Sequence, residues 1–251
     1  MTSDLSSAQP SWPAIRTVGV DGLLVSFGDR LSEPANRAAL AFRAALERDG
    51  PPEIEETSTS LVSAYLRFDA VACDHGAVER AVAALLATRD WYAAPLPQGR
   101  RRWRIPTVFG TDLAPQLDEA AAAAGMSAGD AIHSISETRV RVQTIGFAPG
   151  QPYLGELDPA WDIPRQTELT ERVPIGALTV AIRQLVLFSV STPTGWRHVG
   201  QTAFQLFRPD SADPFVLRPG DEVHFDPVSR EVYERVQAEG PDGGATMERL
   251  P

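Results

Sequence analysis

A loop rich in glycine and proline at residues 146–155 is the part of the chain best suited to hold a ligand. Its sequence, GFAPGQPYLG, carries three glycines, two prolines and two aromatic residues. Glycine lets another molecule approach the backbone, and proline lowers the disorder that binding must remove. Free N–H groups in such a loop can cradle a carboxylate. The candidate ligand contacts here are Gly146, Phe147, Pro149, Gly150, Tyr153 and Gly155. A tight turn between strands, without any ligand, is the open alternative.

Histidine is the side chain best suited to proton transfer near neutral pH, and the chain has four of them. His133 falls in a predicted helix, and His198 stands beside Trp196 in GWRHVGQT. These two are the candidates for proton transfer, although a structural, hydrogen-bonded role is equally open for both. No two histidines have metal-ligand spacing and Cys73 is the sole cysteine, so we expect no metal site.

The basic residues exclude several mechanisms, because all 23 are arginine. Without lysine the chain cannot form a Schiff base, bind pyridoxal phosphate in the usual way, build a lysine-containing P-loop or carry attached biotin. The formal net charge of −10 and a pI of about 4.9 argue against a nucleic-acid partner.

The single cysteine also excludes an internal disulfide, which suits a reducing compartment. The amino-terminal residues lack the basic start and apolar stretch of a signal peptide, and no apolar run approaches the length of a membrane span. These features predict a cytoplasmic protein without a membrane partner.

The first part of the chain predicts a small α/β domain over residues 14–98. Strands are expected at 17–28, 53–59, 61–69 and 90–94, with helices that begin after Ser32 and Asp74. The order β-α-β-β-α-β is that of a ferredoxin-like domain.

The second part, residues 101–236, predicts an all-β sandwich or barrel behind one helical stretch. The helical segments are 111–125 and 127–136, and from 138 onward short β runs are separated by glycine and proline. Residues 95–100 are a predicted linker, and residues 1–13 and 237–251 are predicted flexible tails. The fold class is therefore α+β.

Several motifs occur in a specific order, namely GFAPGQPYLGELD, IPR, RVPIGALTVA, STPTGWRHVGQT, LFRPD and LRPGDEVHFDPV. In this order the chain resembles the family of allophanate hydrolase subunit 1, which also includes the B subunit of 5-oxoprolinase and the kinase A inhibitor. The resemblance covers roughly residues 17–230.

The resemblance implies an α/β domain followed by a cyclophilin-like β-barrel that pairs with a second barrel. That partner is allophanate hydrolase subunit 2 or the C subunit of 5-oxoprolinase. The implied activity is ATP-linked hydrolysis of a small amide, of the 5-oxoproline or allophanate type, with ATP required by the whole complex. Two alternatives stay open: a regulatory inhibitor of a sensor histidine kinase, and a carboxyltransferase component of a biotin-dependent, urea-type carboxylase.

The chain departs from the family pattern at several positions. Ile182 and Arg183 stand where two glycines are usual, Gln151 replaces a phenylalanine and Thr194 a glycine. A planar arginine fork adds fixed charge and donors. We therefore expect a pocket of altered shape, whose further ligand contacts are Arg165, Arg183, Gln184 and Trp196.

Overall fold

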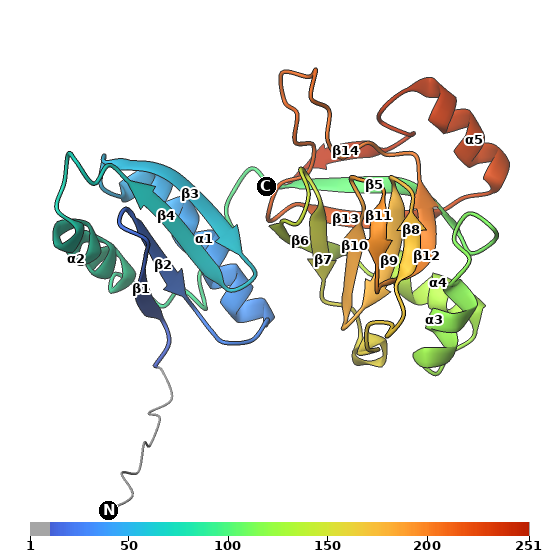
Figure 1. Cartoon of the computed structure of the whole chain (residues 1–251), viewed down its shortest axis with the longest axis horizontal. Coiled ribbons are helices and arrows are strands. Elements are labelled where there is room, and N and C mark those ends of the chain that lie inside the picture. The colour runs from blue at the N-terminus through green and yellow to red at the C-terminus, as the bar shows by residue number, and fades with distance from the viewer. Residues whose placement is uncertain (1–10, 251) are drawn as a thin grey trace, which may run out of the picture. The chain divides into compact units, whose positions relative to one another are not determined.

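The computed structural model describes residues 11–250, which form two compact units with a division between Pro97 and Gln98 (Figure 1). The predicted tail 1–13 falls mostly on residues 1–10, which lie outside the described residues. Each unit has its own buried apolar cluster, as expected of a separate domain.

The amino-terminal unit is an antiparallel sheet in the order β1-β2-β4-β3, accompanied by two helices. The elements are β1 (Ala14–Val18), β2 (Gly22–Ser26), α1 (Glu33–Asp49), β3 (Ile54–Ser60), β4 (Ser63–Phe68) and α2 (His75–Leu86). Ser32 and Asp74 accept hydrogen bonds from Ala35 N and Ala77 N and so begin the two helices where the sequence predicts them.

The strand order of this unit differs from the predicted ferredoxin-like order in two places. The predicted strand 17–28 is divided by a turn at Gly19, where φ is +67°, into the hairpin β1–β2. The predicted strand 90–94 is absent from the described structure, because Trp91 instead turns into the core. Its indole Nε1 donates to Leu86 O, and its ring packs edge-on against Phe42 at 5.0 Å. The described order is therefore β-β-α-β-β-α.

The second unit contains a closed barrel of seven strands among the residues described (Figure 1). The order β12-β9-β10-β7-β6-β13-β5 closes where β12 pairs with β5, and a cyclophilin-like barrel fits this arrangement. The barrel strands are β5 (Arg101–Phe109), β6 (Val140–Ile145), β7 (Pro152–Gly155), β9 (Ala177–Ala181), β10 (Gln184–Leu187), β12 (Arg197–Thr202) and β13 (Glu222–Pro227).

Helices and short strands complete this unit: α3 (Leu117–Ala123), α4 (Ala128–Glu137), the 3₁₀ turn η1 (Pro159–Trp161), β8 (Thr170–Val173), β11 (Thr192–Thr194), α5 (Arg230–Glu239) and β14 (Thr246–Arg249). The predicted helix 111–125 is shorter, since only 117–123 is helical. Residues 237–250 are not the flexible tail expected from their composition. Helix α5 continues to Glu239, and β14 pairs with β5, where Arg102 forms an ion pair with Glu248.

The barrel wall separates two apolar layers, and this separation positions the candidate site. Leu178 and Val180 of β9 and Leu185 of β10 belong to the large barrel core. Alternate residues on the same strands, Ala177, Ala181 and Val186, join a second cluster with Val173, Phe188 and Trp196. Because side chains alternate across a strand, this second cluster lies on the outer face, where β8 contributes Val173 and pairs with β11.

Candidate functional site

A cleft of about 200 Å³ opens beside this outer cluster, between the loop before β7 and the β8–β11 pair. Its lining consists of Phe147, Gln151, Tyr153, Arg165, Leu169, Val186, Phe188, Pro193, Thr194, Gly195 and Trp196. The structure thus brings together four of the predicted ligand contacts, namely Phe147, Tyr153, Arg165 and Trp196. We call it the Arg165 cleft.

Arg165 supplies the positive charge of this cleft. Its Cζ lies 5.1 Å from the centre of the buried Trp196 ring, which in turn meets Tyr153 edge-on at 6.2 Å. A guanidinium over an indole face is held by cation–π attraction. Among the described residues Arg165 has no hydrogen-bond or ion-pair partner, so its donors are available to an anion.

Gln151 supplies an amide to the same cleft. Its side chain is only 1% exposed, and its Oε1 accepts a hydrogen bond of 3.4 Å from Ser189 N. This bond orients the amide and leaves Nε2 without a partner among the residues described. The sequence marks Gln151 only as a departure from the family pattern, and its place in the lining was not predicted. Leu169, Val186, Phe188, Pro193, Thr194 and Gly195 were not predicted either, although the motif STPTGW contains three of these residues.

The loop at 146–151 is closed by two of its own hydrogen bonds. Gly146 N donates to Gln151 O at 3.0 Å, and Gln151 N donates to Ala148 O at 3.1 Å. Within the described part of the chain the N–H groups of Phe147, Ala148 and Gly150 have no partner. Phe147 is 72% exposed at the mouth of the cleft, with φ at +71°. These three main-chain donors therefore lack a partner within the described residues, which is the arrangement that a binding loop requires.

The loop's glycines differ in what they do, although the sequence predicts ligand access for all of them. A Cβ on Gly150, where φ is +69°, would lie 3.0 Å from Leu206 O, and a Cβ on Gly155 would lie 3.0 Å from Gln143 Oε1. Both glycines therefore serve packing within the chain. Only Gly146 of the three has open space around its Cα. Pro149 belongs to the same turn but does not line the cleft.

His198 lies on the sheet face that carries the cleft but does not line it. The register places Tyr153, Val186, Thr179 and His198 in one row across four strands. His198 is 4% exposed, and its Nε2 is buried without a partner in the described structure. Burial lowers the pKa of His198, partly offset by hydrogen bonding with the Gly200 backbone and the Gln201 side chain.

His133 is exposed on α4 and is not part of the cleft lining. The structure therefore brings neither candidate for proton transfer to the ligand contacts. Burial favours the neutral form of His198 over the imidazolium cation, and a neutral imidazole suits a structural role.

Arg183 and Gln184 also lie outside the cleft lining. Arg183 Nε donates to Leu157 O at 3.1 Å, and Gln184 Nε2 donates to Gln143 Oε1 at 2.8 Å. Ile182 and Arg183 form the turn between β9 and β10 with φ of 44° and 60°. Positive φ at both central residues favours glycine, which explains the usual glycines at these positions.

The described residues contain no group of three or more His, Cys, Asp or Glu side chains that could hold a metal ion. None of the helices in the described part of the chain has both the length and the apolar character needed to cross a membrane.

Among known protein families, the model described as carboxyltransferase domain, subdomain C and D, matches residues 13–217 of the chain. The chain is 28% identical over 235 residues to the B subunit of 5-oxoprolinase from Bacillus subtilis (strain 168), covering 90% of this chain and 97% of that protein. It is 37% identical over 123 residues to the B subunit of 5-oxoprolinase from Escherichia coli O157:H7, covering 49% of this chain and 56% of that protein.

Solved structures show the same architecture. The crystal structure of TTHA0988 superposes with a TM-score of 0.68 at 31% identity, covering 86% of this chain and 40% of that one. The urea amidolyase of K. lactis superposes over 94% of this chain and 16% of its own, with a TM-score of 0.71 at 18% identity, which shows the shared fold alone. The chain thus spans less than half the length of these two structures.

Proposed function

Since the chain belongs to the family of carboxyltransferase domains, subdomain C and D, we propose that it is one subunit of a heteromeric, ATP-dependent amidohydrolase. The proposed substrate is a small amide of the 5-oxoproline or allophanate type. Relatives from three bacteria carry the name of the 5-oxoprolinase B subunit, which supports the first of these.

The unpaired Arg165 guanidinium, fixed over Trp196, is the observation that carries this proposal. A small amide that bears a carboxylate needs one fixed cation and a few neutral donors for its carbonyl oxygen. In this cleft Arg165 binds the carboxylate and Gln151 Nε2 donates to the carbonyl oxygen. The ring of Tyr153 packs against the apolar part of the substrate.

The groups that transfer protons come from a partner protein in this proposal, because His133 and His198 do not line the cleft. Phe147 and Leu169, at 72% and 64% exposure, leave apolar surface at its mouth. An exposed apolar rim of this kind favours coverage by another protein. The proposed partner resembles the C subunit of 5-oxoprolinase or allophanate hydrolase subunit 2.

ATP belongs to the reaction of the whole complex, and we place no nucleotide on this chain. The chain has no lysine with which to form a P-loop. The Arg165 cleft has a volume of about 200 Å³, which suits a small anion. This chain's own residues bind and orient the amide and exclude water beneath the aromatic side chains.

The test is turnover by the co-purified complex, assayed for ATP-dependent release of glutamate from 5-oxoproline and of ammonia from allophanate. Arg165→Ala should abolish most turnover while assembly persists, and Arg139→Ala, at another exposed arginine, should be silent. A well-folded wild-type complex that acts on neither compound contradicts the proposal.

A further inference from the structure

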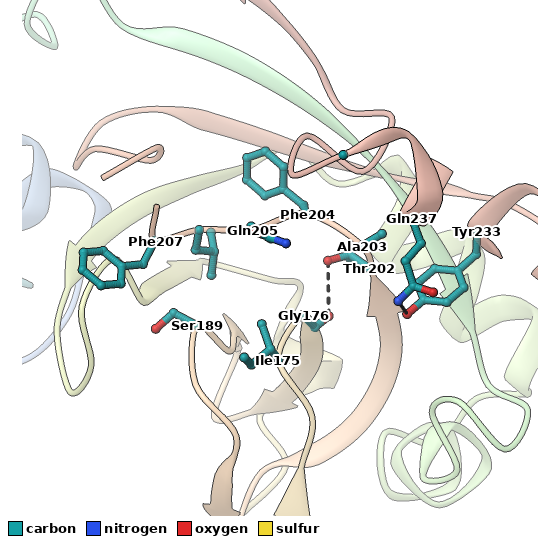
Figure 2. A pocket seen from close by; sticks show the side chains of 12 residues that line it. Ile175, Gly176, Ser189, Thr202, Ala203, Phe204, Gln205, Phe207, Tyr233 and Gln237 are labelled. Carbon is teal, nitrogen blue, oxygen red and sulfur yellow. Dashed lines mark hydrogen bonds between the residues drawn. The ribbon is translucent and has the colours of Figure 1, made fainter. Parts of the chain in front are cut away.

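A second cleft, of about 360 Å³, lies where the adjacent ends of β9 and β12 meet helix α5 (Figure 2). Its walls are the turn at Ile175 and Gly176, the segment 202–207 and the α5 residues Tyr233 and Gln237. The family model ends at residue 217, so the wall formed by α5 (230–239) lies beyond the matched region. We call it the α5 cleft.

The side chains that line the α5 cleft are uncharged. The apolar ones are Ile175, Ala203, Phe204, Leu206 and Phe207, and the polar ones include Ser189, Gln205, Tyr233 and Gln237. Arg208 lies over the Phe204 ring at 5.7 Å, but it forms an ion pair with Asp242 at 2.8 Å. The cleft therefore offers apolar walls and neutral hydrogen-bonding groups without a free charge.

Several of these polar groups have unused hydrogen-bonding capacity. The Ser189 hydroxyl is buried and has no partner among the described residues. Gln237 Nε2 donates to Tyr233 Oη at 3.2 Å, which leaves Gln237 Oε1 as an acceptor and the Tyr233 proton as a donor. Figure 2 shows Gln237 and Tyr233 side by side at one end of the cleft, with Ser189 and Phe207 toward the other.

We infer that the α5 cleft is a binding site for an uncharged small molecule with a flat apolar face and an amide-like pair of donor and acceptor. The apolar walls bind the face, whereas Tyr233 and Gln237, which lie together at one end of the cleft, match the polar edge. A charged ligand is disfavoured, because burying an ion without a counter-charge is costly. This inference does not rest on the proposed function, since it concerns a different set of lining residues.

Three probes of nearly equal size and shape test the charge preference: benzamide is neutral, benzoate anionic and benzamidine cationic. Each is titrated into the full chain, and amide NMR shifts are followed at residues 175–176, 202–207 and 233–240. We expect saturable shifts with benzamide there, and affinities at least about tenfold weaker for both charged probes. If benzoate shifts only the amide signals of residues 146–151, it binds in the Arg165 cleft. That result bears on the proposed function and not on the α5 cleft.

A charge swap gives the second measurement. Gln237→Glu should raise benzamidine affinity at least about tenfold and weaken benzoate further, because it adds a carboxylate to the lining. Gln98→Glu, an exposed site outside the lining, should change neither. Tyr233→Phe should weaken benzamide binding by about three- to tenfold, because it removes the hydroxyl donor beside Gln237. Absence of saturable benzamide shifts at the cleft, equal affinity for all three probes, or an equal response of both Gln→Glu variants overturns the inference.

Discussion

The guanidinium of Arg165 lies over the indole of Trp196, with Cζ 5.1 Å from the ring centre. The aromatic ring thus holds in place a cation that has no ion-pair partner among the described residues. Cation–π attraction positions the charge without neutralising it, unlike an ion pair with a carboxylate. An unpaired charge of this kind is what the proposed anion site requires.

Arg165→Ala should lower kcat/KM for a carboxylate-bearing amide by about 10- to 100-fold, since a hydrogen bond to a charged group contributes about 1.5–3 kcal/mol. Arg165→Lys should recover part of this loss, because it keeps the charge but not the stacked fork. The melting temperature should stay near that of the wild type, as Arg165 is exposed. Equal loss in Arg139→Ala would show a nonspecific charge effect.

Gln151→Leu should destabilise the second unit by about 1–3 kcal/mol, because it leaves the buried Ser189 N–H without its acceptor. Urea unfolding at neutral pH measures the change. Gln98→Leu, at an exposed position, is the control and should lie within about 0.5 kcal/mol of the wild type. If Gln151→Leu is as stable as the control, the Ser189 hydrogen bond contributes little.

Local signals in the sequence predicted the helix starts correctly. Asp74 and Ser127 each cap a helix as expected, because a side-chain oxygen that accepts from a first-turn N–H acts over three residues only. The short β runs from 138 onward likewise predicted a sandwich or barrel, and the closed barrel is one of these two architectures. The last expected β run was wrong, because residues 230–239 form helix α5.

Features that depend on contacts between residues far apart in the sequence could not be predicted from local sequence patterns. Trp91 leaves the predicted last strand because its ring meets Phe42 on another element, and no local rule contains that contact. The sequence predicted that Gly150 and Gly155 give a ligand access to the backbone, but Leu206 and Gln143 fill the space beside them. Residue type and motif position selected Arg183 and Gln184, but these side chains donate hydrogen bonds to Leu157 O and Gln143 Oε1 within the chain.

His198 should make folding stability depend on pH below about 6.5. Burial lowers its pKa in the folded state below the unfolded value of about 6.5. As pH falls below 6.5 the unfolded chain takes up the proton first, so the stability present above that pH is progressively lost. Urea unfolding at several pH values should give a shallower decline in His198→Gln. Identical slopes in both proteins would rule out this residue as the cause.

Ile182→Asn should stabilise the β9–β10 turn by about 1 kcal/mol. Ile182 has φ of 44°, which a β-branched side chain tolerates poorly and asparagine adopts more readily. Its side chain is 42% exposed, so little packing is lost. Thermal or urea unfolding measures the gain, and Ile175→Asn, at an exposed isoleucine without positive φ, should not be stabilising. A destabilised Ile182→Asn would mean that the turn is not strained.

Asp221→Asn should cost about 3–5 kcal/mol of stability, because it removes one partner of a buried ion pair. The side chain of Asp221 is 3% exposed and lies 2.5 Å from Arg101 Nη2, and its oxygens also accept from Arg101 N and Arg218 N. These bonds join the start of β5 to the turn before β13, where the two strands pair in parallel. Asp213→Asn breaks a pair with Arg218 in which both side chains are more than half exposed, so it should cost less than about 1 kcal/mol. Urea unfolding of both variants measures the difference, and equal costs would show that burial of Asp221 does not determine the strength of its pairing.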